Sequence, residues 1–103
     1  MKRLLLSVLP FGLLAFAAPL FAGPRVESAD LSLSAPATKG EYLIDGASWT
    51  CVGTACHSDF VDDMPALRSC KRIVPITGAV TSFNWRGKAL TAAEIADCNT
   101  RAK

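Results

Sequence analysis

The sequence has few of the residues and motifs on which enzymes rely. Its single histidine is His57, and it lacks the G-x-S-x-G motif of hydrolases, the H-E-x-x-H motif of zinc proteases and a glycine-rich phosphate-binding loop. Asp59, Asp62 and Asp63 lie close together, but without the glycine and the final glutamate of an EF-hand calcium loop. We therefore predict no catalytic residue, no metal site and no cofactor, and we expect a protein that is not an enzyme.

The sequence also lacks a large excess of charge of one sign. Its formal net charge is +2, and Lys2 and Arg3 account for all of it, because residues 23–103 carry equal numbers of basic and acidic side chains. A nucleic-acid-binding domain normally carries a basic surplus. We therefore expect no nucleic-acid partner.

Long apolar runs are absent except near the N-terminus. Lys2 and Arg3 precede an uncharged run over residues 4–22 that ends in small residues, which is the layout of a secretory signal peptide. We predict cleavage after Ala22, with Ala17 as the alternative, and hence a periplasmic or secreted protein with no membrane span after cleavage. An uncleaved anchor needs about 20 apolar residues, whereas two prolines and a glycine interrupt this run.

We expect 103 residues to form no more than one small domain. Residues 23–40 contain few large apolar side chains, which predicts a flexible N-terminal arm. Leu31 and Leu33 alternate with serine, so this arm has the pattern of an edge strand docked on the domain. The predicted organisation is a signal peptide over 1–22, the arm over 23–40 and a folded domain over 41–103.

The folded domain begins with strand-forming residues. Residues 42–44 and 49–52 are rich in aromatic and β-branched side chains and flank Asp45-Gly46, which predicts a β-hairpin with Trp49 and Cys51 on one face. A second turn at residues 52–55 would bring Cys51 opposite Cys56.

A helix is predicted after this hairpin. Asp62 and Asp63 precede Met64-Pro65, and carboxylate caps followed by proline are typical of a helix start. Apolar residues follow at spacings of three and four up to Val74, and Pro75 should end the helix. Three basic residues share this helix, and we interpret them as a solvated face, with an anion-binding cluster as the alternative; they are Arg68, Lys71 and Arg72.

The C-terminal third predicts a strand and a second helix. A turn at Thr77-Gly78 leads to a strand over residues 79–85, with Thr81, Phe83 and Trp85 expected on one face, and Arg86-Gly87 turns the chain again. Thr91 and Glu94 have the spacing of a capping box, so the helix should run from Ala92 to about Arg101. The predicted fold is a small disulfide-stabilised α+β domain.

Four cysteines in a short exported chain indicate two disulfides. Because Cys51 faces Cys56 across a hairpin and Cys70 and Cys98 lie on the apolar faces of the two helices, we predict the pairs Cys51–Cys56 and Cys70–Cys98. Structural zinc is a weaker interpretation, since only Cys51 and Cys56 approach the close spacing of zinc ligands.

Two further interpretations concern rare side chains. Cys51, Cys56 and His57 resemble a lengthened C-x-x-C-H motif, so a small electron-transfer protein with haem c is the alternative function. Trp49 and Trp85 are interpreted as core residues rather than as the walls of a binding groove.

Several of these residues recur in a pattern that resembles a known family. The pattern is W-x-C, C, C, G, S-F, G, L and C-N, and it spans Trp49 to Asn99 here. It resembles a family of short, exported, uncharacterised alphaproteobacterial proteins. The resemblance implies a periplasmic or secreted protein, and we expect a non-enzymatic binding or structural module of the cell envelope.

Overall fold

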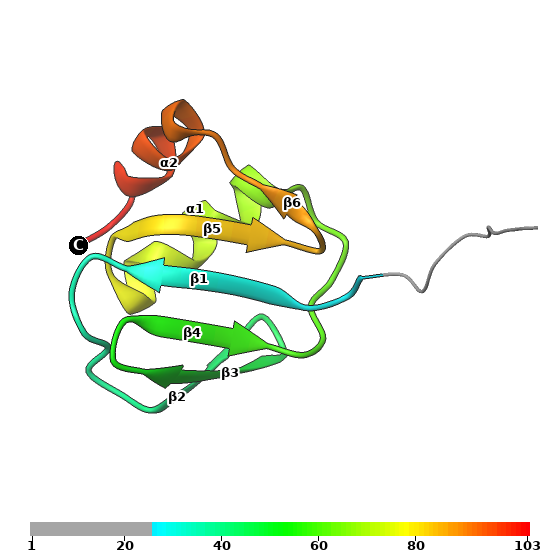
Figure 1. Cartoon of the computed structure of the whole chain (residues 1–103), viewed down its shortest axis with the longest axis vertical. Helices are drawn as coiled ribbons and strands as arrows, with labels where there is room; N and C mark the ends of the chain where they lie inside the picture. The colour runs from blue at the N-terminus through cyan, green and yellow to red at the C-terminus, as the bar shows by residue number, and fades with distance from the viewer. Residues whose placement is uncertain (1–25) are drawn as a thin grey trace, which may run out of the picture.

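The structure is a computed structural model, and it describes residues 26–103; the predicted signal peptide lies outside these residues. In chain order the described part contains β1 (Ala29–Leu33), β2 (Glu41–Ile44), β3 (Ala47–Val52), β4 (Ala55–Ser58), α1 (Ala66–Thr77), β5 (Val80–Trp85), β6 (Lys88–Ala89) and α2 (Ala92–Asn99) (Figure 1). The predicted α+β fold is confirmed.

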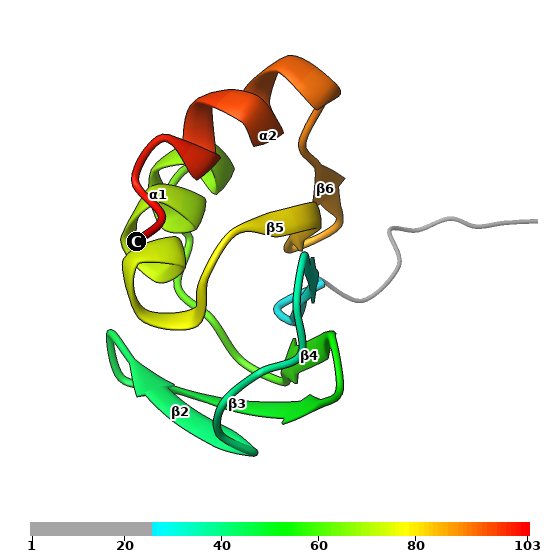
Figure 2. The same ribbon diagram turned by 90° about the vertical axis from the view of Figure 1, so that its left-hand side faces the viewer.

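The strands form one antiparallel sheet in the order β2-β3-β4-β1-β5-β6. Figure 1 looks onto the face of the sheet that neither α1 nor α2 covers, with α1 behind the strands. Figure 2 shows the sheet curving around α1, while α2 packs on α1 at the β5 end. We call the uncovered side the open face.

The hydrophobic core lies between the sheet and α1. Alternate strand residues point inward, as the two-residue period of a strand requires. Trp49 and Trp85 stack with ring centroids 6.4 Å apart, and Phe83 lies 5.7 Å from Trp85. Both tryptophans are buried, so they are core residues and not the walls of a groove.

The expectation of a flexible arm over residues 23–40 is wrong for Ala29–Leu33. This segment is β1, and it lies in the middle of the sheet between β4 and β5, not at an edge. Ala29, Leu31 and Leu33 are buried on its inner side. The burial of two leucines and one alanine, with hydrogen bonds to two neighbouring strands, offsets the entropy that the segment loses on ordering.

Both predicted hairpin turns between β2 and β4 are present. Asp45 and Gly46 have φ angles of 51° and 81° and join β2 to β3, and Gly53, with φ of 62°, begins the turn between β3 and β4. Two-residue hairpin loops prefer such left-handed conformations because they match the twist of the strands. Cys51 and Cys56 therefore lie directly opposite each other, joined by a disulfide.

The first helix begins later than predicted. Asp62 and Asp63 do not cap it: Pro65 is the N-cap, with extended backbone and no side-chain hydrogen bond, and α1 starts at Ala66. The residue before a proline avoids helical conformation, which excludes Met64 from the helix. The Asp62 carboxylate accepts a hydrogen bond from the Met64 N–H at 3.0 Å and so forms a local turn.

Pro75 does not end α1, contrary to the prediction. The helix continues to Thr77, and Gly78, with φ of 103°, ends it. Proline removes one backbone hydrogen bond, but the Gly78 N–H still donates to the Val74 carbonyl at 2.9 Å. Because Ile73 and Val74 are buried against the sheet, packing holds this last turn in place.

The predicted alternation in β5 is wrong at Thr81. Val80, Phe83 and Trp85 point inward, whereas Thr81 is exposed. The pairing of β5 with β1 shifts between Ser32 and Leu33, and such a bulge inserts one unpaired residue and changes the direction of the side chains beyond it.

The second helix has the expected start and ends two residues early. The Thr91 hydroxyl accepts from the Glu94 N–H at 3.2 Å and the Glu94 carboxylate accepts from the Thr91 N–H at 2.9 Å, which forms the capping box. Cys98 is buried and forms a disulfide with Cys70 of α1. Asn99 is the last residue of α2.

Candidate functional site

The open face is hollowed where β3, β4, β1, β5 and β6 lie side by side. A depression of about 630 Å³ lies over these strands, and its lining consists mainly of short side chains. Strand alternation places these residues outward while their neighbours fill the core. The outward polar residues of the lining include Asp30, Ser32, Thr50, His57 and Asn84.

The register of the sheet arranges polar side chains in a row across the open face. Thr50 of β3 pairs with His57 of β4, which pairs with Asp30 of β1, and Asp30 pairs with Asn84 of β5. Directly opposed residues in antiparallel strands have side chains within contact distance. The row therefore brings together residues from four strands and from both halves of the sequence.

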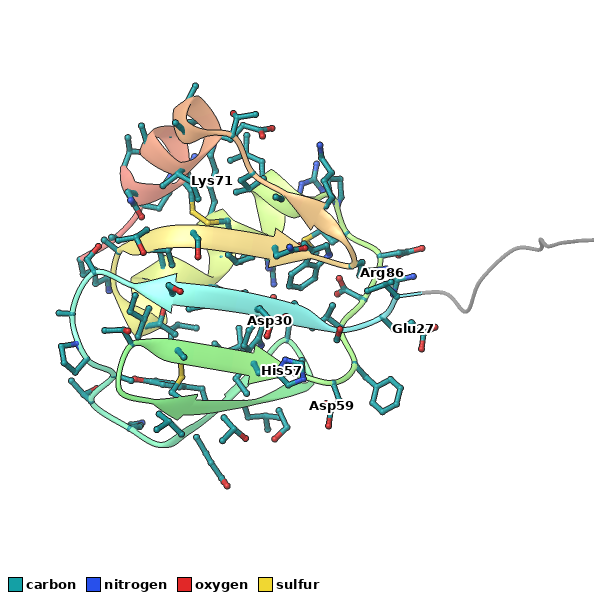
Figure 3. All side chains as sticks on the ribbon, in the orientation of Figure 1. Glu27, Asp30, His57, Asp59, Lys71 and Arg86 are labelled. Atoms are coloured by element: carbon teal, nitrogen blue, oxygen red, sulfur yellow. A yellow bond between two sulfur atoms is a disulfide. The ribbon has the colours of Figure 1, made fainter. Side chains whose placement is uncertain are left out.

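His57 lies between two carboxylates. Its Nδ1 is 2.6 Å from Asp30 Oδ1 and its Nε2 is 2.8 Å from Asp59 Oδ1. In Figure 3 Asp30 and His57 lie on neighbouring strands of the open face, and Asp59 follows β4. The hydrogen bond to Asp30, and then the one to Asp59, raise the pKa of His57 above its usual value.

This geometry requires the charged form of the imidazole. Only the imidazolium can donate from both ring nitrogens at once. With both nitrogens engaged, His57 has no free acceptor with which to deprotonate a neighbouring hydroxyl, such as that of Thr50 or Ser32. The arrangement suits binding and charge recognition better than general base catalysis.

Each carboxylate contacts His57 through a single oxygen. Asp30 and Asp59 both use Oδ1 for His57, and within residues 26–103 neither Oδ2 has a hydrogen-bond partner. Asp59 borders a second depression of about 330 Å³, which shares Thr50 and His57 with the larger one and ends at Phe60. Phe60 is 73% exposed, although it is a large apolar side chain.

The two depressions have a net negative lining. Their ionisable residues are Asp30, His57 and Asp59, which together carry one negative charge while His57 is protonated and two when it is neutral. A negative surface favours a cationic or hydrogen-bond-donating ligand.

The residues present do not fit haem c. The sulfur atoms of Cys51 and Cys56 are bonded to each other, so neither is available for a thioether bond. In addition, Cys56 points into the core while its neighbour His57 points to the open face. Across residues 26–103 no group of three or more histidine, cysteine, aspartate or glutamate side chains is placed to hold a metal ion.

The other residues singled out from the sequence lie away from the open face. Cys70 and Cys98 join α1 to α2, and Thr91 and Glu94 cap α2. The three basic residues of α1 face its solvent side, where Lys71 pairs with Asp97 and Arg72 with Asp45.

Sequence reasoning did not find two important residues. Asp30 belongs to the segment expected to be a flexible arm, and only the alternation of Leu31 and Leu33 indicated a strand there. Asn99 makes two hydrogen bonds to the backbone of Val80, of 2.9 and 2.8 Å, and so fastens α2 to β5. The sequence signal for Asn99 was its position in the C-N pair that ends the family pattern.

None of the helices formed by residues 26–103 is both long enough and apolar enough to cross a membrane.

Comparison with protein families, curated proteins and solved structures places the chain in a family. Neither the curated proteins nor the solved structures contain a significant match to the chain. The model of a family of unknown function, DUF8200, matches residues 11–100. Because this match covers most of the sequence, the chain belongs to the DUF8200 family.

Proposed function

We propose that this protein is an exported, non-enzymatic binding module that uses the open face of its sheet to bind a ligand carrying a cationic group. Two observations support export: the N-terminal sequence has the layout of a signal peptide, and the folded part contains two disulfides and no free cysteine. Disulfides persist in oxidising compartments such as the periplasm.

The observation that carries the proposal is the hollowed, uncovered open face with its negative lining. Sheets with one solvated face are common, but here the outward residues are short near the centre and leave a depression of about 630 Å³. The Oδ2 atoms of Asp30, in this depression, and of Asp59, in the adjoining depression of about 330 Å³, have no hydrogen-bond partner among residues 26–103 and can accept from the N–H groups of a protonated amine.

The state of His57 supports a binding role rather than a catalytic one. Its two nitrogens are both engaged, so the imidazolium acts as a bridge that holds two carboxylates 2.6 and 2.8 Å from its ring. This arrangement orients the acceptors before a ligand arrives, which lowers the entropy cost of binding.

The proposal is tested by NMR titration of the protein purified from cells that express the full chain. The probe is N-acetyl-lysine amide, and N-acetyl-glutamate amide is the matched probe of opposite charge. We expect the lysine probe to shift the amide signals of Asp30, His57 and Asp59, and the glutamate probe to leave them unchanged.

Two variants locate the site. Thr50→Trp should fill the depression and weaken binding of the lysine probe, whereas Ala96→Trp, on the exposed side of α2, should not. The proposal is overturned if the lysine probe shifts no signal on the open face, or if Thr50→Trp binds it as well as the unmodified protein does.

A further inference from the structure

A third depression lies on the opposite side of the molecule, where α1 meets the end of α2. It has a volume of about 380 Å³, and its lining consists of one leucine and four basic side chains; these are Leu67, Arg68, Lys71, Arg72 and Arg101. We call this the basic depression. Three of its cations come from consecutive turns of α1, and the fourth comes from the residues that follow α2.

Two of these cations are held in place by acidic partners. Lys71 Nζ lies 3.1 Å from Asp97 Oδ2, and Arg72 donates two hydrogen bonds of 2.7 Å to the carboxylate of Asp45. Arg68 and Arg101 are exposed, and within residues 26–103 neither has an acidic partner. The depression therefore presents two guanidinium groups whose donors are free.

The scaffold of the basic depression is rigid. The Cys70–Cys98 disulfide joins the residues next to Lys71 and Asp97. A covalent bond and a neighbouring ion pair therefore both connect α1 to α2. In Figure 3 Lys71 lies between the two helices. Asn99 fastens the end of α2 to β5, and the Arg101 N–H donates to the Cys98 carbonyl at 3.0 Å, which fixes the backbone that carries Arg101.

The charge balance of this region differs from that of the rest of the chain. The four cations and their two carboxylate partners leave two positive charges, whereas residues 23–103 are formally neutral. A solvated helix face usually pairs its charges with nearby acids. The two unpaired arginines here instead converge from separate elements on one depression.

The chemistry of arginine indicates the ligand. A guanidinium presents a planar fork of donors that matches the oxygens of phosphate, and two such forks bind one phosphate group better than scattered lysines do. Ile76, one turn beyond Arg72 on α1, is 52% exposed and places an apolar side chain beside the same helix face.

We propose that the basic depression is a binding site for a phosphate group, carried either by an anionic lipid headgroup or by a soluble phosphate. Arg68 and Arg101 bind the phosphate oxygens, while Lys71 and Arg72 add positive charge to the same lining. This site is separate from the open face and does not depend on the function proposed for it.

The test compares the two sources of phosphate, using the protein purified from cells that express the full chain. One arm measures co-sedimentation with phosphatidylglycerol vesicles, with phosphatidylcholine vesicles as the neutral reference. The other arm measures binding of glycerol 3-phosphate by NMR shifts of the Arg68 and Arg101 amides. Saturable binding to phosphatidylglycerol vesicles alone would identify the ligand as a lipid headgroup. Binding of glycerol 3-phosphate would identify it as a soluble phosphate.

Matched variants separate this site from general electrostatic attraction. Arg68→Gln with Arg101→Gln should weaken binding about 30-fold, since each basic residue near an anionic surface contributes about fivefold. Lys39→Gln with Lys88→Gln removes the same net charge from other exposed positions and should weaken binding far less. Asp45→Asn releases Arg72 and should strengthen binding.

The proposal is overturned if the protein binds neither phosphatidylglycerol vesicles nor glycerol 3-phosphate. It is also overturned if both double variants weaken binding equally, because the attraction would then follow net charge alone. Equal binding to vesicles that owe the same charge to fatty-acid carboxylates would overturn the assignment of phosphate. Unchanged circular dichroism spectra of the variants establish that any loss reflects the site and not the fold.

Discussion

His57 is the residue through which pH acts on the open face. Its two carboxylate contacts raise its pKa, with Asp30 as the larger cause and Asp59 as the smaller one. A group whose pKa is higher in the folded state stabilises the fold fully below its unfolded pKa, and this contribution is lost as pH rises through the folded pKa. Deprotonation also makes the lining of the depressions more negative.

We predict that this pKa is measurable directly, because His57 is the only histidine in the chain. The imidazole signals in an NMR titration should have a midpoint above that of an unstructured histidine. Asp30→Asn should lower this midpoint more than Asp59→Asn does, since Asp30 makes the larger contribution. A midpoint at the ordinary value would show that the two ion pairs do not persist in solution.

The same contacts predict how stability depends on pH. His57→Gln should reduce the free energy of unfolding at pH 5 by less than about 1 kcal/mol, because the pairs are exposed and screened. The reduction should become smaller as pH rises above the raised pKa. Denaturant unfolding at several pH values checks the sign: a variant that loses more stability at high pH than at low pH would contradict it.

The side chain of Asn99, in α2, forms hydrogen bonds with the backbone of β5. Its side-chain amide accepts from the Val80 N–H and donates to the Val80 carbonyl, so it binds the backbone of β5 beyond the end of β6, which pairs only with Asn84 and Trp85. Asn99→Ala should lower the free energy of unfolding by about 1–3 kcal/mol, because it leaves two backbone groups unpaired in the interior.

The matched control for Asn99 is Asn84→Ala on the open face. Asn84 is exposed, and its removal should change stability by no more than about 0.5 kcal/mol. Urea denaturation with unchanged slope compares the two variants. Equal stability of Asn99→Ala and Asn84→Ala would show that the amide does not fasten α2 to β5.

At the scale of elements, the two disulfides differ in how much they stabilise the fold. Cys51–Cys56 joins two strands that a two-residue turn already holds together, with a sequence separation of 5. Cys70–Cys98 joins the two helices, with a separation of 28, and both of its residues are fully buried. The second bond therefore restricts the unfolded chain more strongly.

Chain-entropy estimates give about 2 kcal/mol for the Cys51–Cys56 loop and about 3.5 kcal/mol for the Cys70–Cys98 loop. We predict that replacing Cys70 and Cys98 together by alanine destabilises the protein more than replacing Cys51 and Cys56 together. Thermal unfolding of both double variants under oxidising conditions measures the difference. The opposite order would indicate that the stability of the protein depends more on the disulfide of the β3–β4 hairpin than on that of the helix pair.

At the scale of the whole molecule, opposite charges gather on opposite sides. The open face carries Asp30 and Asp59 around one imidazolium, while the basic depression on the helix side carries two unpaired arginines. The net charge of residues 23–103 is zero, so this separation is invisible in the composition. The two faces are suited to ligands of opposite charge.

Export is a prediction about the whole chain. We expect the protein isolated from the producing cells to begin at Gly23, because cleavage after Ala22 removes the segment with the layout of a signal peptide. Its intact mass should match the processed chain with two disulfides and rise on reduction by about 4 Da, the mass of the hydrogen atoms that two disulfides take up. N-terminal sequencing that begins at Met1 in a membrane fraction would contradict the prediction.

The sequence by itself determined the features that depend on near neighbours. The turn at Asp45-Gly46 and the capping box of Thr91 and Glu94 arise from residues no more than three positions apart, and their patterns point to the observed geometry. The pairing of Cys70 with Cys98 was accessible because helical periodicity places each cysteine on an apolar face. Local stereochemistry is enough for the turn and the capping box, and for the pairing it sets the face of each helix on which the cysteine lies.

Only the tertiary structure decided where these elements meet. Asp30 and His57 are 27 residues apart, and they form a pair because β1 enters the middle of the sheet. The continuation of α1 past Pro75 and the exposure of Thr81 likewise depend on packing against distant segments. The free energy of packing against a sheet comes from many contacts between distant segments, and sequence spacing does not reveal these contacts. It outweighs the local preferences that predicted a flexible arm, a helix end at Pro75 and an inward-facing Thr81.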